Sequence, residues 1–341
     1  MILEGVEPEL LAGLSLRRLS HLVAVAQAGS ITAAAEALFM SPSAVSGSIT
    51  ELERALQSDL LVRRRGHGVT LTPTGTYVLD RARSLLSEAA ELSYLARSGE
   101  ELVGPLAVGC FVTLAPTVLP RLLVEFEALH PKVTLDFIDG SQDDIQAMLL
   151  AGDLDMALMY ELDLSVALDW IVLDEPRAYA LFGEDHHLAK QDSVTLEQLA
   201  TEPLVLFDAA PSTSYVHVLF EGRGLEPKVR YRTHSYELTR SIIARNPSYY
   251  AILVQRPSNR FSYERLPIIE REIEPLLPAC PVILAWPKEH RPSPRAQAFA
   301  DVARRLHAGP TDAGSRSHGD AGRQVGGVTQ RERGGPRRRQ G

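Results

Sequence analysis

Apolar residues recur at helical spacing along roughly the first 60 positions of the chain, in short segments joined by polar turns. Steps of three and four residues predict a first helix that ends near Gly29, with its apolar stripe at Leu16, Leu19, Val23 and Ala26. Ser30 and Thr32 mark the start of the next segment. The alanine-rich run over residues 32–38 predicts a second helix, because alanine is the best helix former and its small side chain lets another helix cross closely.

A third helix is predicted to begin at Pro42, because Ser41 can cap the free amides and proline is favoured at the first helical position. Its buried face is predicted at Val45, Ile49, Leu52 and Leu56, and its exposed face at Ser43, Ser46, Gly47 and Thr50. Three such helices indicate a helix-turn-helix, and the small polar face fits a DNA major groove about 12 Å wide. The alternative is an ordinary three-helix core with a solvated serine face.

Residues 60–71 read as two short strands around a glycine-rich tip, a hairpin that we call the wing. Three consecutive arginines, Arg63, Arg64 and Arg65, stand at its bend. Beside a helix-turn-helix they favour contacts to phosphates or to a narrow minor groove. A solvated run of charge is the alternative.

Thr72 and Pro73 predict the start of a helix that continues to about Arg97. Apolar residues along it follow a 3.5-residue repeat that is typical of a coiled-coil seam: Val78, Ala82, Leu85, Ala89, Leu92 and Ala96. We therefore predict dimerisation through this helix, so that two winged domains read two half-sites related by a dyad. The alternative is that the stripe packs on its own domain.

From Leu106 the chain alternates strand and helix patterns in the order β-α-β-α-β, which predicts a parallel sheet covered on both faces. A second set of strands and helices begins near Trp170. Strands near residues 266–270 and 282–285, with a helix near 294–306, are interpreted as a return to the first set. Residues beyond Leu306 are almost free of apolar side chains, which predicts a disordered tail over 308–341.

The run Ala34-Ala35-Glu36-Ala37-Leu38-Phe39-Met40-Ser41-Pro42-Ser43-Ala44-Val45-Ser46, with Leu71-Thr72-Pro73-Thr74-Gly75, resembles the LysR-type transcriptional regulators. The chain departs from the family's usual pattern at Pro42-Ser43, where Gln-Pro is common, and at Gly47 and Ser48, where larger polar residues are common. Few long side chains remain for base contacts. We therefore expect the protein to distinguish DNA sequences through Arg54, the wing, short hydroxyls and DNA shape. The expected DNA-binding residues are Ser30, Thr32, Ser41, Pro42, Ser43, Ser46, Gly47, Thr50, Arg54, Arg63, Arg64 and Arg65.

The resemblance implies an α/β fold class: a winged helix-turn-helix over 14–72, a linker helix over 73–98, and a two-lobed, doubly wound effector domain over 104–307 that resembles periplasmic binding proteins. Ligands bind such sheets at the carboxyl ends of the strands. The expected effector-binding residues are Thr113, Ser141, Phe207, Asp208, Ser212 and His234. The serines and Thr113 could instead be helix or turn caps, and His234 a satisfied surface residue.

Composition changes this picture little. The formal net charge is −8, with a modest local excess of arginine in the N-terminal domain. Two cysteines exclude a disulfide framework; Cys110 and Cys280 could form a thiol sensor, but their apolar surroundings favour buried structural thiols. Motifs of phosphate-binding loops, nucleophile elbows and zinc proteases are missing, so we expect no enzyme, cofactor or metal. Without a signal peptide or membrane span, a cytoplasmic protein is expected.

The sequence thus predicts a LysR-type regulator whose promoter binding or bending is tuned by a small-molecule effector between the lobes, an organic acid or amino-acid-like molecule by resemblance. Homodimers, and homotetramers of them, are the expected assemblies. The competing hypothesis is a small-molecule-binding protein that lacks sequence-specific DNA recognition.

Overall fold

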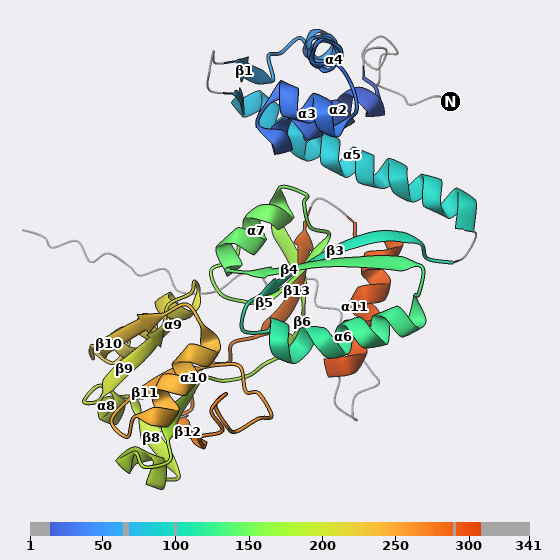
Figure 1. Cartoon of the computed structure of the whole chain (residues 1–341). Coiled ribbons are helices and arrows are strands. Elements are labelled where there is room, and N and C mark those ends of the chain that lie inside the picture. The colour runs from blue at the N-terminus through green and yellow to red at the C-terminus, as the bar shows by residue number, and fades with distance from the viewer. Residues whose placement is uncertain (1–13, 64–67, 99–100, 289–290, 308–341) are drawn as a thin grey trace, which may run out of the picture. The chain divides into compact units, whose positions relative to one another are not determined.

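The computed structural model describes residues 14–63, 68–98, 101–288 and 291–307. Its N-terminal domain holds α2 (Leu16–Ala28), α3 (Ile31–Ala37) and α4 (Pro42–Leu56), followed by the hairpin of β1 (Leu61–Arg63) and β2 (Val69–Leu71). The strands pair antiparallel, with Leu61 opposite Leu71. The three helices and the wing strands predicted from periodicity are confirmed (Figure 1).

Each of these helices begins where a serine hydroxyl accepts a hydrogen bond from a free amide of the first turn. Ser15 caps α2, Ser30 caps α3 and Ser41 caps α4. Three of the four residues predicted for the apolar face of α4, Val45, Ile49 and Leu52, are fully inaccessible, and the fourth, Leu56, is partly buried. These side chains meet Leu22 and Val25 of α2 and Ala34 and Ala35 of α3 in one core.

The linker helix α5 (Pro73–Ser98) is as long as predicted. The first part of the predicted dimer seam, however, faces inward. Ala82 is 1% exposed and lies in the core of the N-terminal domain, and Val78 packs against that core. These two residues therefore pack on their own domain, which was the alternative to a dimer seam. The reason is that α5 packs against α2 and contributes side chains to the core of the N-terminal domain. Leu85 and Leu92 remain 44% and 71% exposed, and the side chain of Ala96 lies outside the described residues.

The first lobe is a mixed sheet in the order β4-β3-β5-β13-β6. Its strands are β3 (Gly104–Phe111), β4 (Val133–Gly140), β5 (Met156–Tyr160), β6 (Leu168–Asp174) and β13 (Val282–Pro287). β3 runs parallel to β4 and β5, whereas β13 is antiparallel to both β5 and β6. One face is covered by α6 (Ala115–Leu129) and α11 (Pro294–His307), and the other by α7 (Gln142–Leu150) (Figure 1).

The second lobe is a sheet in the order β10-β9-β11-β7-β12-β8. Its strands are β7 (Tyr179–Gly183), β8 (Ser193–Thr195), β9 (Pro203–Phe207), β10 (Lys228–Thr233), β11 (Tyr250–Leu253) and β12 (Ile268–Glu274). Its helices are the 3-10 turn η1 (His187–Lys190), α8 (Leu196–Leu199), α9 (Ser212–Glu221) and α10 (Tyr236–Arg245).

The structure corrects three sequence assignments in this region. The sheet of the first lobe is mixed rather than parallel. The strand near Trp170, assigned to the second set, is β6 and pairs with β13 in the first lobe. The strand near Leu266 to Glu270, interpreted as a return, stays in the second lobe as β12 beside β7. Local pattern does not reveal the pairing partner of a strand, because pairing depends on contacts far apart in the chain. The return through β13 and α11 is confirmed.

Candidate functional site: a nucleic-acid interface and an effector pocket

The exposed face of α4 consists of short polar groups, as predicted. Ser43, Gly47 and Thr50 are exposed and Ser46 is partly exposed. The Ser41 hydroxyl accepts from the amide of Ala44 at 3.2 Å and lies 3.0 Å from the Ser43 hydroxyl. The Thr50 hydroxyl donates to the carbonyl of Ser46 at 3.0 Å. This surface presents hydroxyls and a helix N-terminus, which together suit phosphate and base-edge contacts.

Gly47 opens a broad hollow between α2 and α4, because nothing lies within 4 Å of the position that a Cβ would occupy there. Arg17, Arg18 and Ser48 line the hollow. Ser48 is held by the ring of His21, whose Nδ1 lies 2.7 Å from its hydroxyl. Arg18 is paired with the exposed carboxylate of Glu51. Arg17 was not among the predicted DNA-binding residues, although it comes from the same face of the domain.

The other predicted DNA-binding residues lie around this surface. Thr32, Pro42 and Arg54 are exposed, and Ser30 is partly exposed at the start of α3. Arg63 ends β1, with its side chain outside the described residues, and Arg64 and Arg65 lie outside them altogether.

A small pocket between the two lobes gathers residues from several elements. Thr113 follows β3, Tyr160 ends β5, Phe207 ends β9, and Ser212 begins α9. The remaining lining residues are Leu162, Tyr215, Val216, Tyr236, Ile252, Leu253, Val254 and Gln255. The pocket volume is about 20 Å³. Strand ends and helix starts meet here, as the carboxyl-end rule for such sheets requires.

Three of the six predicted effector-binding residues line this pocket: Thr113, Phe207 and Ser212. The other three are not among its lining residues. Ser141 caps α7, because its hydroxyl accepts from the amide of Asp144 at 3.2 Å. Asp208 accepts from the hydroxyl of Thr213 at 2.8 Å and pairs with Arg232. His234 is exposed, and its Nδ1 contacts the carbonyl of Asp208. Ser141 therefore fits the cap that was weighed as its alternative.

The predicted set omitted the tyrosines of the pocket and Gln255. Tyr160 ends a buried strand, so the rule that selected Thr113 would also have selected it. Tyr215 and Tyr236 lie in the first turns of α9 and α10, close to predicted residues. No sequence signal marks Gln255, which follows β11 and reaches back to Thr117 of α6 at 2.8 Å.

Hydroxyl groups dominate the chemistry of the pocket. Tyr179 and Tyr236 both donate to the carbonyl of Gln255. The hydroxyls of Thr113, Tyr160 and Tyr215 are buried and make no hydrogen bond of normal geometry in the described structure, although Tyr160 lies near Thr113 and Tyr215 near Cys280, close enough for each pair to interact. Burial raises the pKa of Tyr160 and of Tyr215 well above the ordinary value, so both phenols stay protonated. They can donate as well as accept a hydrogen bond.

Two family models match the chain, one over each domain. The sequence model described as "Bacterial regulatory helix-turn-helix protein, lysR family" matches residues 16–76. The model described as "LysR substrate binding domain" matches residues 99–308, more than half of the chain. The chain belongs to the LysR family. It is a DNA-binding transcriptional regulator with an effector-binding domain, and not a solute-binding module alone. The family consists of transcriptional regulators rather than enzymes.

Individual LysR relatives match between 42% and 86% of the chain. The regulator YvbU of Bacillus subtilis is 28% identical over 300 residues, covering 86% of this chain and 99% of YvbU. The dual regulator OxyR of Escherichia coli is 29% identical over 235 residues, 68% of this chain and 76% of OxyR. EstR of Acinetobacter baylyi is 40% identical over 146 residues, 42% of this chain and 48% of EstR.

Solved LysR structures share the architecture. HinK of Pseudomonas aeruginosa superposes with a TM-score of 0.58 at 29% identity and covers 86% of this chain and 98% of HinK. A cysteine variant of full-length OxyR from the same organism reaches a TM-score of 0.69 at 24% identity, covering 85% of this chain and 95% of OxyR, which shows a shared fold.

Within the described part of this LysR regulator, no helix is both long and apolar enough to cross a bilayer.

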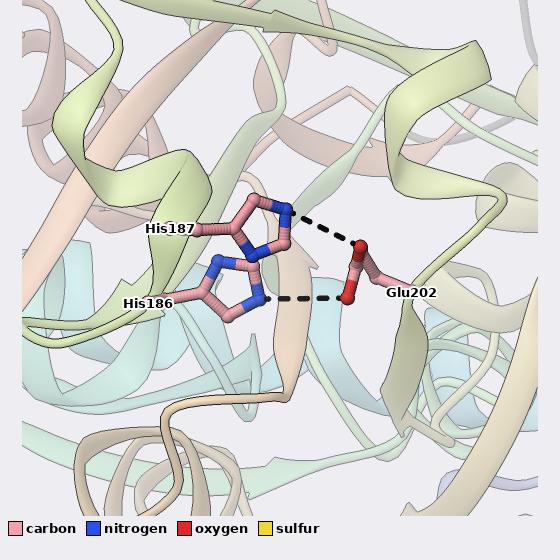
Figure 2. A group of neighbouring side chains, drawn as sticks. All are labelled: His186, His187 and Glu202. Atoms are coloured by element: carbon pink, nitrogen blue, oxygen red, sulfur yellow. Dashed lines mark ion pairs between the residues drawn. The ribbon is translucent and has the colours of Figure 1, made fainter.

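A cluster of His186, His187 and Glu202 in the second lobe has the composition of a metal site, and its ligand atoms lie within 4.8 Å of one another. Figure 2 shows each ring pointing its Nε2 at one carboxylate oxygen, at 4.0 Å for His186 and 3.4 Å for His187. The two rings are stacked at 18°, so their in-plane lone pairs run nearly parallel and do not converge on one ion.

The hydrogen bonding of His186 also disfavours a metal. Its Nδ1 accepts from the amide of Leu188 at 3.1 Å, which places the proton of the neutral ring on Nε2, the atom that would have to bind the ion. His186 is fully buried and caps η1. The cluster is therefore best explained as a structural element of the second lobe.

The folding stability of this LysR regulator is expected to fall as the pH drops below the ordinary histidine value of 6.5. Burial, and then the charge of His187, lower the pKa of His186 in the folded protein. The unfolded chain consequently takes up a proton that the folded chain resists, and stability is lost in acid. Urea unfolding at pH 7.5 and pH 5.5 measures the loss.

His186→Asn retains an acceptor for the Leu188 amide and should reduce this pH dependence. His187→Asn, which alters the exposed neighbour, should preserve most of it. The assignment fails if H186N and the parent protein lose the same stability between the two pH values.

Proposed function

We propose that this LysR regulator binds a dyad-related DNA site through two copies of its N-terminal domain, and that a small molecule in the interlobe pocket alters that binding. The observation that supports the first half is the exposed, capped, small polar face of α4. The pocket with its buried hydroxyls supports the second half.

The DNA interface that we propose has a centre and a rim. Ser43, Ser46, Gly47 and Thr50 of α4 face the major groove, and the starts of α3 and α4, at Ser30, Thr32, Ser41 and Pro42, approach phosphates. Favourable interaction of a helix N-terminus with anions supports this placement. Arg54 and the wing arginines at positions 63–65 supply charge-dependent affinity at the rim.

We also propose that the distal half of α5 forms the dimer contact. Leu85 and Leu92 are exposed on one stripe, with Ala89 between them partly buried, whereas large apolar side chains on a solvated helix usually have a partner. Pairs of dimers would then associate into tetramers. An effector that favours one arrangement of the DNA-binding pairs by about 1–3 kcal/mol is sufficient for a useful switch.

Leu92→Glu is expected to shift the protein from dimer to monomer and to weaken binding to a dyad site, because the substitution places charge in the apolar contact. Sedimentation velocity and DNA titration measure the two effects. Ala90→Glu is the matched control, since Ala90 is exposed on the same helix but points away from the seam. Equal behaviour of L92E and A90E would contradict the proposed seam.

Peroxide sensing is not part of this proposal, although the matched relatives include the hydrogen peroxide-inducible genes activator of Pectobacterium carotovorum, 28% identical over 235 residues. Both cysteines of the chain, Cys110 and Cys280, are buried. Burial raises the pKa of each thiol, so neither forms the thiolate that reacts with oxidants.

The test of the proposed function is capture of sheared genomic DNA from the source organism by the purified protein at physiological salt, with sequencing of the retained fragments. Enrichment of a few intergenic fragments that share an interrupted dyad is the expected result. Retention no higher than that of random DNA would contradict sequence-specific binding.

A further inference from the structure

Among the residues that the structure describes, those lining the interlobe pocket carry no charged side chain. Its twelve lining residues are tyrosines, aliphatic residues, Phe207, Thr113, Ser212 and Gln255. None of these twelve described residues is an aspartate, glutamate, lysine, arginine or histidine. A ligand that enters is stripped of water and meets hydrogen-bonding groups without a counter-ion, which penalises any charged molecule.

We propose that the effector of this protein is a small uncharged molecule that carries a hydroxyl or amide group and is held by Thr113, Tyr160 and Tyr215. The inference rests on the proposed function, because it names the ligand class of the same pocket. It replaces the organic acid that family resemblance suggested.

The first support is the set of buried hydroxyls. Thr113 and Tyr160 are 4% and 3% exposed, and their hydroxyls interact only with each other, without a hydrogen bond of normal geometry in the described structure. The Tyr215 hydroxyl, on α9, is buried too and has only the weakly hydrogen-bonding thiol of Cys280 beside it. Buried polar groups are nearly always paired in folded proteins, so three hydroxyls with spare hydrogen-bonding capacity at one pocket suit a ligand that carries a donor or an acceptor.

The second support is that each neighbouring arginine has a carboxylate partner of its own. Arg240, 1% exposed, pairs with Glu237 through Nε and donates from Nη2 to the carbonyls of Asn259 and Phe261, while its Nη1 is buried and makes no hydrogen bond of normal geometry in the described structure. Arg256 pairs with Glu272 at 2.6 Å. Neither arginine lines the pocket.

The third support is the start of α9, where an anion would otherwise find free amides. The amide of Ser212 already donates to the carbonyl of Ala209 at 2.7 Å. Asp208, which accepts from the hydroxyl of Thr213 and pairs with Arg232, places a carboxylate beside this helix start. The helix start therefore offers a carboxylate ligand less than helix geometry alone would provide.

The pocket volume of about 20 Å³ is close to that of one or two water-sized probes, so a larger ligand must widen the cleft. Gln255 is hydrogen-bonded to both lobes. Its side chain donates to Thr117 of the first lobe, and its carbonyl accepts from Tyr179 and Tyr236 of the second. Entry of the ligand is thus coupled to the contacts that join the lobes.

The proposal is tested with matched neutral and anionic probes on the full chain. Acetamide and acetate, and benzamide and benzoate, share shape but differ in charge. Ligand-observed NMR titration should show that at least one amide binds about 10-fold or more tightly than its acid. Tighter or equal binding of the acids overturns the proposal, and so does failure of both amides to bind.

Variants identify the site. Tyr160→Phe and Tyr215→Phe remove one hydroxyl each and should weaken amide binding about 5-fold, the usual loss for one hydrogen bond. Tyr250→Phe is the matched control, because its hydroxyl is also buried without a hydrogen bond of normal geometry but lies outside the pocket lining. Unchanged amide binding in both Y160F and Y215F overturns the assignment.

DNA binding is measured on the same samples without probes. A wild-type protein that selects amides but retains no specific DNA would contradict the proposed function and leave the ligand class supported. Specific DNA binding together with a preference for the acids would overturn the ligand class alone.

Discussion

Gly47→Glu is expected to reduce specific DNA binding about 10- to 100-fold, and Gly47→Arg to strengthen binding at low salt. Gly47 is exposed on the face of α4 assigned to the major groove, and no atom lies within 4 Å of its missing Cβ. A long side chain therefore fits without disturbing the fold. A carboxylate there repels phosphates and base-edge acceptors, at a cost comparable to one wrong base pair, about 1–3 kcal/mol.

The two substitutions place opposite charges at the same position, so their expected effects on DNA binding are opposite. An arginine that reaches one phosphate should steepen the salt dependence, with a change in logarithmic slope of about 0.9. DNA titration over a salt series, using a fragment retained from the genome, measures both effects. Gln27→Glu is the matched control, because Gln27 is exposed at the end of α2 and not on α4.

Both variants should fold at least as well as the parent, since glycine inside a helix costs about 0.5–1 kcal/mol relative to alanine. Loss of DNA binding in G47E with unchanged thermal stability is the decisive pattern. Equal DNA binding by G47E and the parent protein would remove α4 from the interface.

Gly75→Ala is expected to destabilise the N-terminal domain by about 1–3 kcal/mol or more and to abolish DNA binding through loss of fold. A Cβ on Gly75 would stand 2.0 Å from the carbonyl oxygen of Leu60. That oxygen already accepts from the amide of Thr72 at 2.9 Å, and the Thr72 hydroxyl accepts from the amide of Gly75 at 2.9 Å. Neither backbone segment can yield without breaking these bonds.

Thermal unfolding followed by far-ultraviolet circular dichroism measures the effect. Tryptophan fluorescence reports the effector domain separately, because both tryptophans of the chain, Trp170 and Trp286, lie in β6 and β13. Gly47→Ala makes the same chemical change in open space and should stabilise the domain by about 0.5–1 kcal/mol. A G75A protein as stable as the parent would show that the close approach to Leu60 relaxes at no cost.

The contact also gives a physical reason for the Leu-Thr-Pro-Thr-Gly pattern at residues 71–75. Thr72 ties the end of the wing to the start of α5, because its hydroxyl donates to the carbonyl of Asp59 and accepts from Gly75. Pro73 begins the helix, and Gly75 lets α5 pass against Leu60. The motif therefore fixes the direction in which the linker helix leaves the domain.

The interlobe pocket could be predicted only in part. Thr113 and Phe207 were found because each follows or ends a recognisable strand at the edge where ligands bind. Asp208 and His234 were placed in the cleft by the same rule, yet their side chains turn to local partners, Thr213 and the Asp208 backbone. Side-chain direction at a strand end depends on neighbours that the rule does not include.

The sequence by itself determined the elements of the N-terminal domain and the family. Helix periodicity, serine caps and the threonine-proline start are local signals, and local signals are visible in the order of residues. The 3.5-residue seam of α5 was visible in the sequence too. The sequence did not show that one part of the seam is buried and the other exposed: Ala82 is enclosed by its own domain, while Leu92 is exposed. Only the tertiary structure decided this, because the crossing of α5 over α2 determines which part of the stripe is covered. The same holds for the β6–β13 pairing and for the tyrosines at the pocket, since they are brought together by contacts between residues distant in sequence.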